Sequence, residues 1–342
     1  MRRSSELLKD LDPVRDITDW PSTPQIDWAA MQGGPALDGA GRMTAQLGRR
    51  WRRRAALGAV AVGVAACVTG AVIVQVTGAP APVFAATPPP LRLQYDTGAP
   101  AARDTLLRLA ASVEKQAEPA PPRSGPVSFV QVAQWSLDFS SGESGTTAAI
   151  LPQVISVWRA ADGSGKRATV TLGPSDLDRL PDAPTLLAVA ARRTPAAETY
   201  AAGQLTFSVT EPTPGNLAQV LYGHQPLEDP AVSTARGIAD LYRWAAVDRD
   251  VRVAALRLLA RTDKVLLRGT VTDRLGREGI AVSVDSQDHG TRDLLIFDQH
   301  TGWLLAYESI FLRKPEKLPV QVPAVFSYVL YLAQDRRPDT NG

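Results

Sequence analysis

Few residues in this chain have the types and spacing that phosphate binding or catalysis requires. Asp162-Gly163-Ser164-Gly165-Lys166 resembles the end of a phosphate-binding loop. That loop also needs an earlier glycine at a fixed spacing and a hydroxyl residue after the lysine, so that backbone N–H groups and the hydroxyl can hold phosphate and Mg²⁺. The chain has Ala160 and Arg167 at those two positions. The segment therefore predicts a hairpin turn rather than a nucleotide site.

Candidate metal ligands gather in one C-terminal region of the sequence. They are Asp288, His289, Asp293, Asp298 and His300, and the remaining histidine, His224, lies apart from them. Both histidines of this group fall in predicted turns, where aspartate commonly accepts hydrogen bonds from the nearby backbone. The pattern favours turn chemistry over a zinc-type ligand set. We expect no metal and no cofactor.

Nucleophilic catalysis has no support in the sequence either. Residues 91–342 contain no Gly-x-Ser-x-Gly elbow, and the one cysteine, Cys67, lies inside a long apolar run. An activated nucleophile needs a base and an orienting group around it. We therefore expect a protein that is not an enzyme.

The apolar run from Ala55 to Val76 dominates the N-terminal part of the chain, with only Thr69 and Gln75 clearly polar. A helix rises about 1.5 Å per residue, so a run of this length spans a hydrocarbon core of about 30 Å. The sequence predicts a transmembrane helix over 55–77. The basic residues that flank it are Arg49, Arg50, Arg52, Arg53 and Arg54. Under the positive-inside rule, the tail 1–54 is cytoplasmic and the C-terminal part extracytoplasmic, at the cell membrane.

Two alternatives to an uncleaved transmembrane helix remain open for this apolar run. Val64-Ala65-Ala66-Cys67 has the form of a lipobox, and a start at Met43 would place a short basic region before it. Lipidation of Cys67 would make the protein a surface lipoprotein. Against this, residues 68–76 stay apolar where a lipoprotein usually continues with a polar tether. Cleavage after Val83-Phe84-Ala85 is the third alternative.

The charge distribution argues against nucleic-acid binding. The tail 1–54 carries a formal charge of +3, and the rest of the chain holds 27 basic against 28 acidic residues. The basic surplus thus belongs to the membrane flank, and no basic face interleaved with aromatic residues is evident elsewhere. A zinc-binding anti-sigma module is excluded too, because the tail contains neither histidine nor cysteine.

The rest of the chain predicts one extracytoplasmic domain over 101–335, after a proline-rich tether at 78–100 and before a disordered end at 336–342. Helical periodicity predicts helices in 101–116, 184–193, 216–222, 230–245 and a segment after Asp248. Alternating apolar residues predict strands in 127–139, 154–159, 168–172, 265–271, 280–284, 294–297, 303–307 and 320–332. This order predicts an α+β fold, a curved antiparallel sheet with helices packed on one face.

Aromatic residues are the remaining candidates for a binding site. They are Phe129, Trp135, Trp158, Trp244, Trp303, Tyr307 and Phe326. Such residues usually form the core between a sheet and its helices. If the curved sheet closes incompletely over its helices, they would instead line an apolar pocket for an acyl chain or a peptide.

Several segments together resemble an uncharacterised actinobacterial family of single-pass membrane proteins with an extracytoplasmic domain. They are Glu6-Leu7-Leu8-Lys9-Asp10-Leu11-Asp12-Pro13, the Arg-flanked span, Ala254-Ala255-Leu256-Arg257-Leu258-Leu259-Ala260, Gly269-Thr270-Val271-Thr272-Asp273-Arg274-Leu275-Gly276-Arg277 and Leu295-Ile296-Phe297-Asp298-Gln299-His300-Thr301-Gly302-Trp303-Leu304-Leu305. The family has no assigned reaction or binding residues. The element order is also remotely similar to the LolA-like half-barrel of periplasmic lipoprotein carriers and of sensor domains that regulate anti-sigma factors.

The sequence thus favours a non-enzymatic, membrane-anchored extracytoplasmic domain. Its partner would be an apolar ligand such as a lipid, or another membrane or secreted protein, sensed outside and reported through the short cytoplasmic tail. The alternative is a surface lipoprotein or lipid carrier anchored through Cys67.

Overall fold

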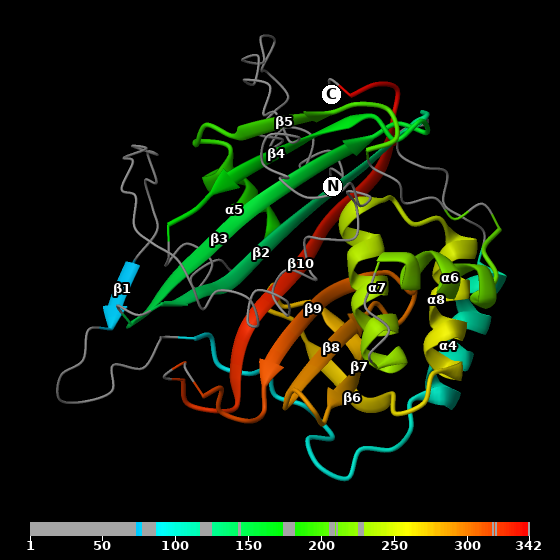
Figure 1. Ribbon diagram of the computed structural model, residues 1–342. Coiled ribbons are helices and arrows are strands. Elements are labelled where there is room, and N and C mark those ends of the chain that lie inside the picture. Colours follow the sequence, from blue (N-terminus) through cyan, green and yellow to red (C-terminus); the bar gives the residue numbers. More distant parts are fainter. Residues whose placement is uncertain are drawn as a thin grey trace, which may run out of the picture.

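The computed structural model describes residues 73–76, 87–116, 125–142, 145–173, 182–204, 209, 211–224, 229–316, 318 and 320–340. Nine strands form an antiparallel sheet in the order β5-β4-β3-β2-β10-β9-β8-β7-β6, and β1 pairs with β3 beside that path. The strands are β1 (Ile73–Val76), β2 (Val127–Gly142), β3 (Gly145–Arg159), β4 (Gly165–Thr171), β5 (Ala196–Tyr200), β6 (Leu266–Thr272), β7 (Glu278–Ser286), β8 (Thr291–Phe297), β9 (Leu304–Phe311) and β10 (Ala324–Arg337). The predicted α+β fold with an antiparallel sheet is confirmed (Figure 1).

The C-terminal strand β10 joins two halves of this sheet. It pairs with β2 over residues 327–337 and with β9 over residues 324–330. Figure 1 shows it in red between the green strands β2 to β5 and the yellow and orange strands β6 to β9. The last strand of the chain therefore completes a sheet whose other members lie up to about two hundred residues earlier.

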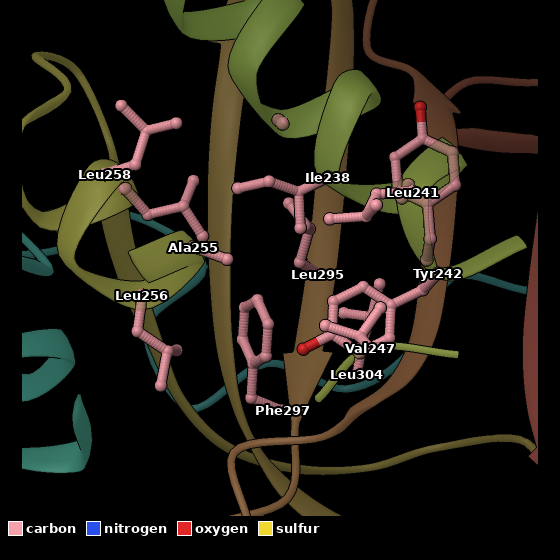
Figure 2. Packing of buried hydrophobic residues seen from close by; sticks show 14 of the residues in the cluster. Ile238, Leu241, Tyr242, Val247, Ala255, Leu256, Leu258, Leu295, Phe297 and Leu304 are labelled. Carbon is pink, nitrogen blue, oxygen red and sulfur yellow. The ribbon is translucent and has the colours of Figure 1, made fainter. Parts of the chain in front are cut away.

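Four of the helices in the described part of the chain cover one face of the sheet, which we call the helix face. They are α4 (Arg103–Lys115), α6 (Pro214–His224), α7 (Pro230–Trp244) and α8 (Arg249–Arg261). In Figure 2, Ile238 and Tyr242 of α7 point toward Leu295 and Phe297 of β8, with Leu256 of α8 alongside. α7 begins where the sequence predicts it, because the Asp229 carboxylate accepts a hydrogen bond from the next turn and Pro230 occupies the first helical position.

One helix lies on the opposite face, so the prediction that helices pack on one face only is wrong for α5 (Ala183–Ala190). Its buried residues Leu186 and Leu187 belong to a second core that includes Trp135 and Val170 of the long strands. The physical reason is that β2, β3 and β4 carry apolar side chains on both faces. Each face must then be covered to keep it from water.

Residues 87–101, which we call the strap, run along the free edge of β6. The backbone N–H groups of Gln94 and Tyr95 donate to the Arg268 carbonyl, and the N–H of Leu267 donates to the Pro100 carbonyl. Leu91 and Leu93 of the strap pack against the core of the face opposite the helices. The predicted tether 78–100 is therefore docked on the sheet from residue 87 onward, and it covers an edge that would otherwise expose unpaired backbone groups.

The predicted transmembrane segment lies largely outside the described residues, as do the tail 1–54 with its five flanking arginines and Cys67. Four residues of the 55–77 segment are described, and they form strand β1 instead of helix, paired with residues 146–149 of β3. Three of the four are β-branched, which favours a strand. No helix in the described part of the chain combines the length and apolar character that crossing a membrane requires.

At the other end, β10 continues to Arg337, two residues into the segment 336–342 that the sequence predicts to be disordered. Arg337 is 5% exposed, so the sheet rather than the tail holds these two residues.

A glycine at the junction of α4, α8 and the β8–β9 turn gives a test of this packing. Gly302 has φ of +66°, and a Cβ added there would lie 2.8 Å from Val113 Cγ2. Gly276 has a similar φ of +76° but nothing within 4 Å of an added Cβ. We expect Gly302→Ala to lower the free energy of unfolding by about 3 kcal/mol, since overpacking adds to the backbone strain.

The matched control Gly276→Ala should lose only the strain contribution, about 1–2 kcal/mol. Denaturant unfolding of the full chain, followed by tryptophan fluorescence, measures both. Equal losses for the two variants would contradict the close contact of Gly302 with Val113.

Candidate functional site

The seven aromatic residues singled out from the sequence fall into separate clusters. On the face opposite the helices, Phe129 and Trp158 lie with ring centroids 5.0 Å apart, and Trp135 stacks on Tyr328 at 5.9 Å. Phe326 stacks on Phe311 at 4.1 Å. These contacts are core packing between neighbouring strands.

The other three aromatic residues lie with the helix face or its loops. Tyr307 is in the core beneath α7, and Trp244 ends α7. Trp303 lies under the Arg252 guanidinium, 5.3 Å from its ring centroid. The structure thus divides the seven residues between two faces of the sheet and does not bring them together. A binding role for any of them stays a prediction.

The region of His289 and His300 shows the turn chemistry that the sequence predicts. The Asp298 carboxylate accepts hydrogen bonds from the backbone N–H groups of His300 and Thr301, at 2.9 and 2.6 Å. Asp162 in the same way accepts from Ser164, so the loop that resembled a phosphate site is a hairpin turn. Within the described ranges, no group of three or more His, Cys, Asp or Glu residues could hold a metal ion.

A buried polar cluster anchors α7 to the sheet. The Asp293 carboxylate on β8 is fully buried, and it accepts hydrogen bonds from the Tyr307 hydroxyl at 2.6 Å and from Arg236 Nε of α7 at 3.1 Å. Ser309 donates to the same carboxylate. Burial and the nearby Asp293 charge raise the pKa of Tyr307 well above its ordinary value, so it remains a neutral donor. The cluster is internally satisfied and serves to position α7.

Two further buried carboxylates are also paired with arginine. Arg274 donates to both oxygens of Glu308, at 2.7 and 3.1 Å, and its other hydrogen bond goes to the Pro89 carbonyl of the strap. Arg277 donates to Asp273 and to the backbone carbonyls of two strands. Burial raises the pKa of Glu308, and the Arg274 charge opposes that rise. Such bidentate pairs satisfy charges that would otherwise be costly to bury.

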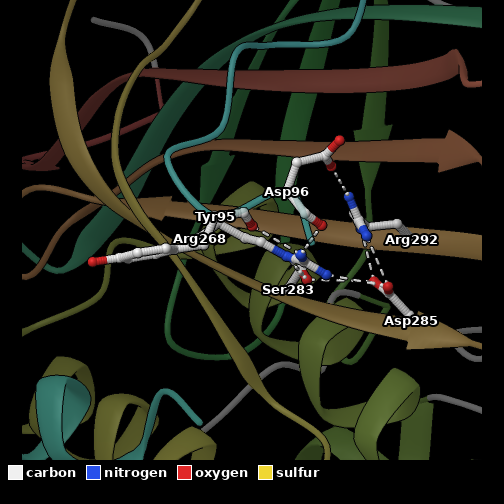
Figure 3. A network of polar contacts seen from close by, with 6 residues as sticks. All are labelled: Tyr95, Asp96, Arg268, Ser283, Asp285 and Arg292. Carbon is white, nitrogen blue, oxygen red and sulfur yellow. Dashed lines mark hydrogen bonds and ion pairs between the residues drawn. The ribbon is translucent and has the colours of Figure 1, made fainter. Parts of the chain in front are cut away.

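Figure 3 shows the polar network that fastens the strap, which we call the latch: Arg268, Ser283, Asp285, Arg292, Tyr95 and Asp96. Arg268 is 2% exposed and donates to the backbone carbonyls of Tyr95 and Asp96 and to the Asp285 carboxylate. Arg292 donates to both oxygens of Asp285 and to the Asp96 carboxylate. Two arginines and two carboxylates thus join the strap to strands β6, β7 and β8.

The Asp285 carboxylate is the shared centre of the latch. Burial alone would raise the pKa of Asp285, but the hydrogen bonds from Arg292 and the charges of Arg292 and Arg268 outweigh burial and hold the pKa below its ordinary value. The ionised form is therefore the one that the fold stabilises.

A second group of arginines includes two, Arg159 and Arg167, that form no salt bridge with a carboxylate among the described residues, although Glu198 lies opposite Arg167 on β5. Arg159 on β3 and Arg167 on β4 share the helix face, since Arg159 pairs with Ser128 and Arg167 pairs with Val157 of the helix-face core. Trp244 of α7 lies near them, with its ring centroid 5.8 Å from Arg167 Cζ. We call Arg159, Arg167, Arg336, Tyr200 and Trp244 the arginine site; all five are partly exposed.

Charge in the arginine site is incompletely matched. Arg336 pairs with Asp248 at 2.7 Å, but neither Arg159 nor Arg167 forms an ion pair with any residue that the structure describes. The Nε atoms of both are buried without a hydrogen-bond partner in the same part of the chain. Burial, together with the charge of Arg336, lowers the pKa of Arg159. Arginine nevertheless stays protonated in proteins, so Arg159 and Arg167 are cations at diagonal positions on adjacent strands.

The sequence did not reveal this site. Its members are spread over 177 residues, from Arg159 to Arg336. Strand pairing brings Arg159, Arg167, Tyr200 and Arg336 to neighbouring positions. The one local signal is the pair Lys166-Arg167 directly after a hairpin turn, which places one cation on each face of β4.

Comparisons with known proteins give little further information. No protein-family model matches the chain, and no curated protein matches it. Among solved structures, a chain in "The complex structure of Pseudomonas aeruginosa MucA/MucB" aligns with 13% sequence identity and a TM-score of 0.25. The alignment covers 70% of this chain and 58% of that chain, less than two thirds of its length. A TM-score this low does not establish a shared fold, and the resemblances to a single-pass family and to LolA-like half-barrels stay predictions.

The latch gives a test with a defined pH dependence. We expect Asp285→Asn to lower the free energy of unfolding at pH 7 by about 3 kcal/mol, because it leaves two arginines without their shared charge. The folded-state pKa of Asp285 lies below the unfolded value of about 3.9. The stability that ionised Asp285 contributes is therefore complete above the unfolded-state pKa and is lost as the pH falls through the folded-state pKa. The difference in free energy of unfolding between variant and wild type should thus shrink below about pH 4.

Asp96→Asn is the matched control, because the Asp96 side chain is 75% exposed and its carboxylate forms an ion pair with Arg292 at the surface of the latch. Its loss should stay below about 1 kcal/mol. Denaturant unfolding at pH 7, 5 and 3 measures both variants. An Asp285→Asn effect that is independent of pH would contradict the proposed role of the ionised carboxylate.

Proposed function

We propose that this chain is a non-enzymatic, extracytoplasmic binding domain that is attached to the cell membrane through the apolar run that precedes β1 and recognises a protein partner on its helix face. The observation that carries this proposal is the contrast between two sets of charged residues. The buried carboxylates Asp273, Asp293 and Glu308 are each paired with an arginine. The partly exposed Arg159 and Arg167 form no salt bridge with a carboxylate in the described part of the chain, and their Nε atoms lack a hydrogen-bond partner there.

This contrast favours binding over catalysis. A general acid or base must be able to reach a substrate, and a carboxylate that already holds an arginine in a buried ion pair is poorly placed to exchange protons with one. Unmatched cations at the surface, by contrast, attract and orient an anionic partner. The arginine site is therefore the better candidate for contact with another molecule.

The strap supports attachment of the domain to a preceding segment. It follows the predicted span within about ten residues, and from residue 87 onward it is fixed by the latch and by Arg274. A rigid connection of this kind would pass a change in the sheet to the chain on its N-terminal side. Sensing outside and reporting inside is thus the form of binding function that we propose.

Protease treatment of intact protoplasts tests the topology. In cells that produce the full chain with an epitope at each end, external protease should remove the C-terminal epitope and spare the N-terminal one. The positive-inside distribution of Arg49 to Arg54 is the physical reason. An endogenous cytoplasmic protein that stays intact is the control, and protection of both epitopes would overturn the extracytoplasmic assignment.

Cys67→Ser separates the anchor from the lipoprotein alternative. We expect the variant to keep the size and membrane retention of the wild type, because an uncleaved span does not depend on a thiol. Measurement of its mass and its membrane fraction is sufficient. Loss of acylation and of processing in the variant would establish the lipoprotein instead.

A further inference from the structure

We propose that the arginine site binds a carboxylate of an acidic segment of the protein partner, with Arg159 and Arg167 as the two residues that hold it. This inference rests on the proposed binding function and names the chemistry that the partner must present.

The register of the sheet places the two guanidinium groups within reach of one anion. Arg159 pairs with Gly165, and Arg167 is two residues further along the same strand, opposite Val157. Diagonal neighbours of this kind on adjacent antiparallel strands are about 7–8 Å apart at Cα, and arginine side chains are long enough to converge from that separation. Gly165 has no side chain, so nothing from that position lies between Arg159 and Tyr200 in the next row.

The carboxylates near the two arginines have other hydrogen-bond partners, although Glu198 of β5 lies directly opposite Arg167 of β4. Arg336 is engaged by Asp248, and the Tyr200 hydroxyl donates to Glu198 at 2.7 Å. Burial, together with Glu198, raises the pKa of Tyr200 to about 12, and the charge of Arg167 and its side-chain hydrogen bond with Tyr200 act in the opposite direction. Tyr200 is therefore a neutral neighbour, and it does not neutralise Arg167.

Trp244 forms an aromatic wall beside Arg167. A guanidinium over an indole ring can keep this cation–π contact while its N–H groups donate to a carboxylate. Trp244 is itself only partly buried, so its remaining surface can contact an apolar group next to the carboxylate.

The acidic residues at the rim favour a carboxylate over a phosphate group. Glu198 is exposed, and the Asp248 side chain is 57% exposed beside Arg336. Both would repel a dianion more strongly than a single negative charge. At the position between the two arginines, a single carboxylate of the acidic segment is therefore a better match than a phosphate monoester.

Fluorescence anisotropy of fluorescein-labelled octaglutamate with the purified full chain tests this proposal. Wild type should bind octaglutamate at least tenfold more tightly than octaglutamine. Arg159→Gln and Arg167→Gln should each weaken binding at least fivefold, and Arg159→Lys should fall between, because it keeps the charge and loses the bidentate contact. Binding should be lost below about pH 4, where glutamate becomes protonated.

Arg108→Gln is the matched control, since Arg108 is exposed on α4, away from the site, and the substitution removes the same charge. It should change the affinity less than twofold. An equal loss for Arg108→Gln would show that only net charge matters and would overturn the site. Competition by phosphatidylglycerol vesicles, but not by unlabelled octaglutamate, would overturn the carboxylate assignment. Thermal unfolding of each variant shows whether a loss of binding is caused by misfolding. If a glutamine variant is misfolded, the affinity of Arg159→Lys for octaglutamate tests the site instead.

The carboxylate inference and the proposed function can fail independently of each other. If wild type fails to bind octaglutamate although protoplast proteolysis places the domain outside, only the carboxylate inference is overturned. If proteolysis places the domain inside, the proposed function fails whatever the affinity for the peptide.

Discussion

The pairing of β10 between β2 and β9 is the constraint on which the rest of the structure depends. Without it, the meander β2 to β5 and the hairpins β6 to β9 would be two separate sheets with open edges. With it, both halves share one surface on which α7 and its neighbours can pack. β10 also carries Arg336 to the row of Ser128 and Arg159, so the same pairing assembles the arginine site.

A sheet that is apolar on both faces needs cover on both, and the structure provides it by different means. Helices cover one face, whereas α5 and the strap cover parts of the other. The strap has little apolar surface of its own, chiefly Leu91 and Leu93, so the latch supplies specific polar contacts in addition. A buried ion pair adds little net stability when complete but is costly to break, and it therefore fixes where the strap lies.

Local patterns in the sequence predicted local structure well. The Asp229-Pro230 pair marked the start of α7, alternation marked most strands, and the turn role of Asp298 follows from its hydrogen bonds. These patterns could not show which residues contact one another when they are far apart in the sequence. Alternation does not reveal that Trp135 and Trp158 face away from Tyr307, because strand order and register decide which faces meet. The apolar composition of Ile73–Val76 likewise fits a helix or a strand until its pairing with β3 is known.

The same limit explains why arginines were overlooked as candidates. In a sequence, Arg159, Arg236, Arg274 and Arg292 are equivalent surface cations. In the fold, the last three meet Asp293, Glu308 and Asp285, respectively. Among the described residues, the charge that acts on Arg159 is the like charge of Arg336, across Ser128. Holding two like charges near each other opposes folding. The buried carboxylates named above already have other arginines as partners, so they do not compensate this repulsion. An anionic partner that binds at Arg159 and Arg167 would relieve this repulsion, so the site that costs the free domain stability is the one that gains most on binding.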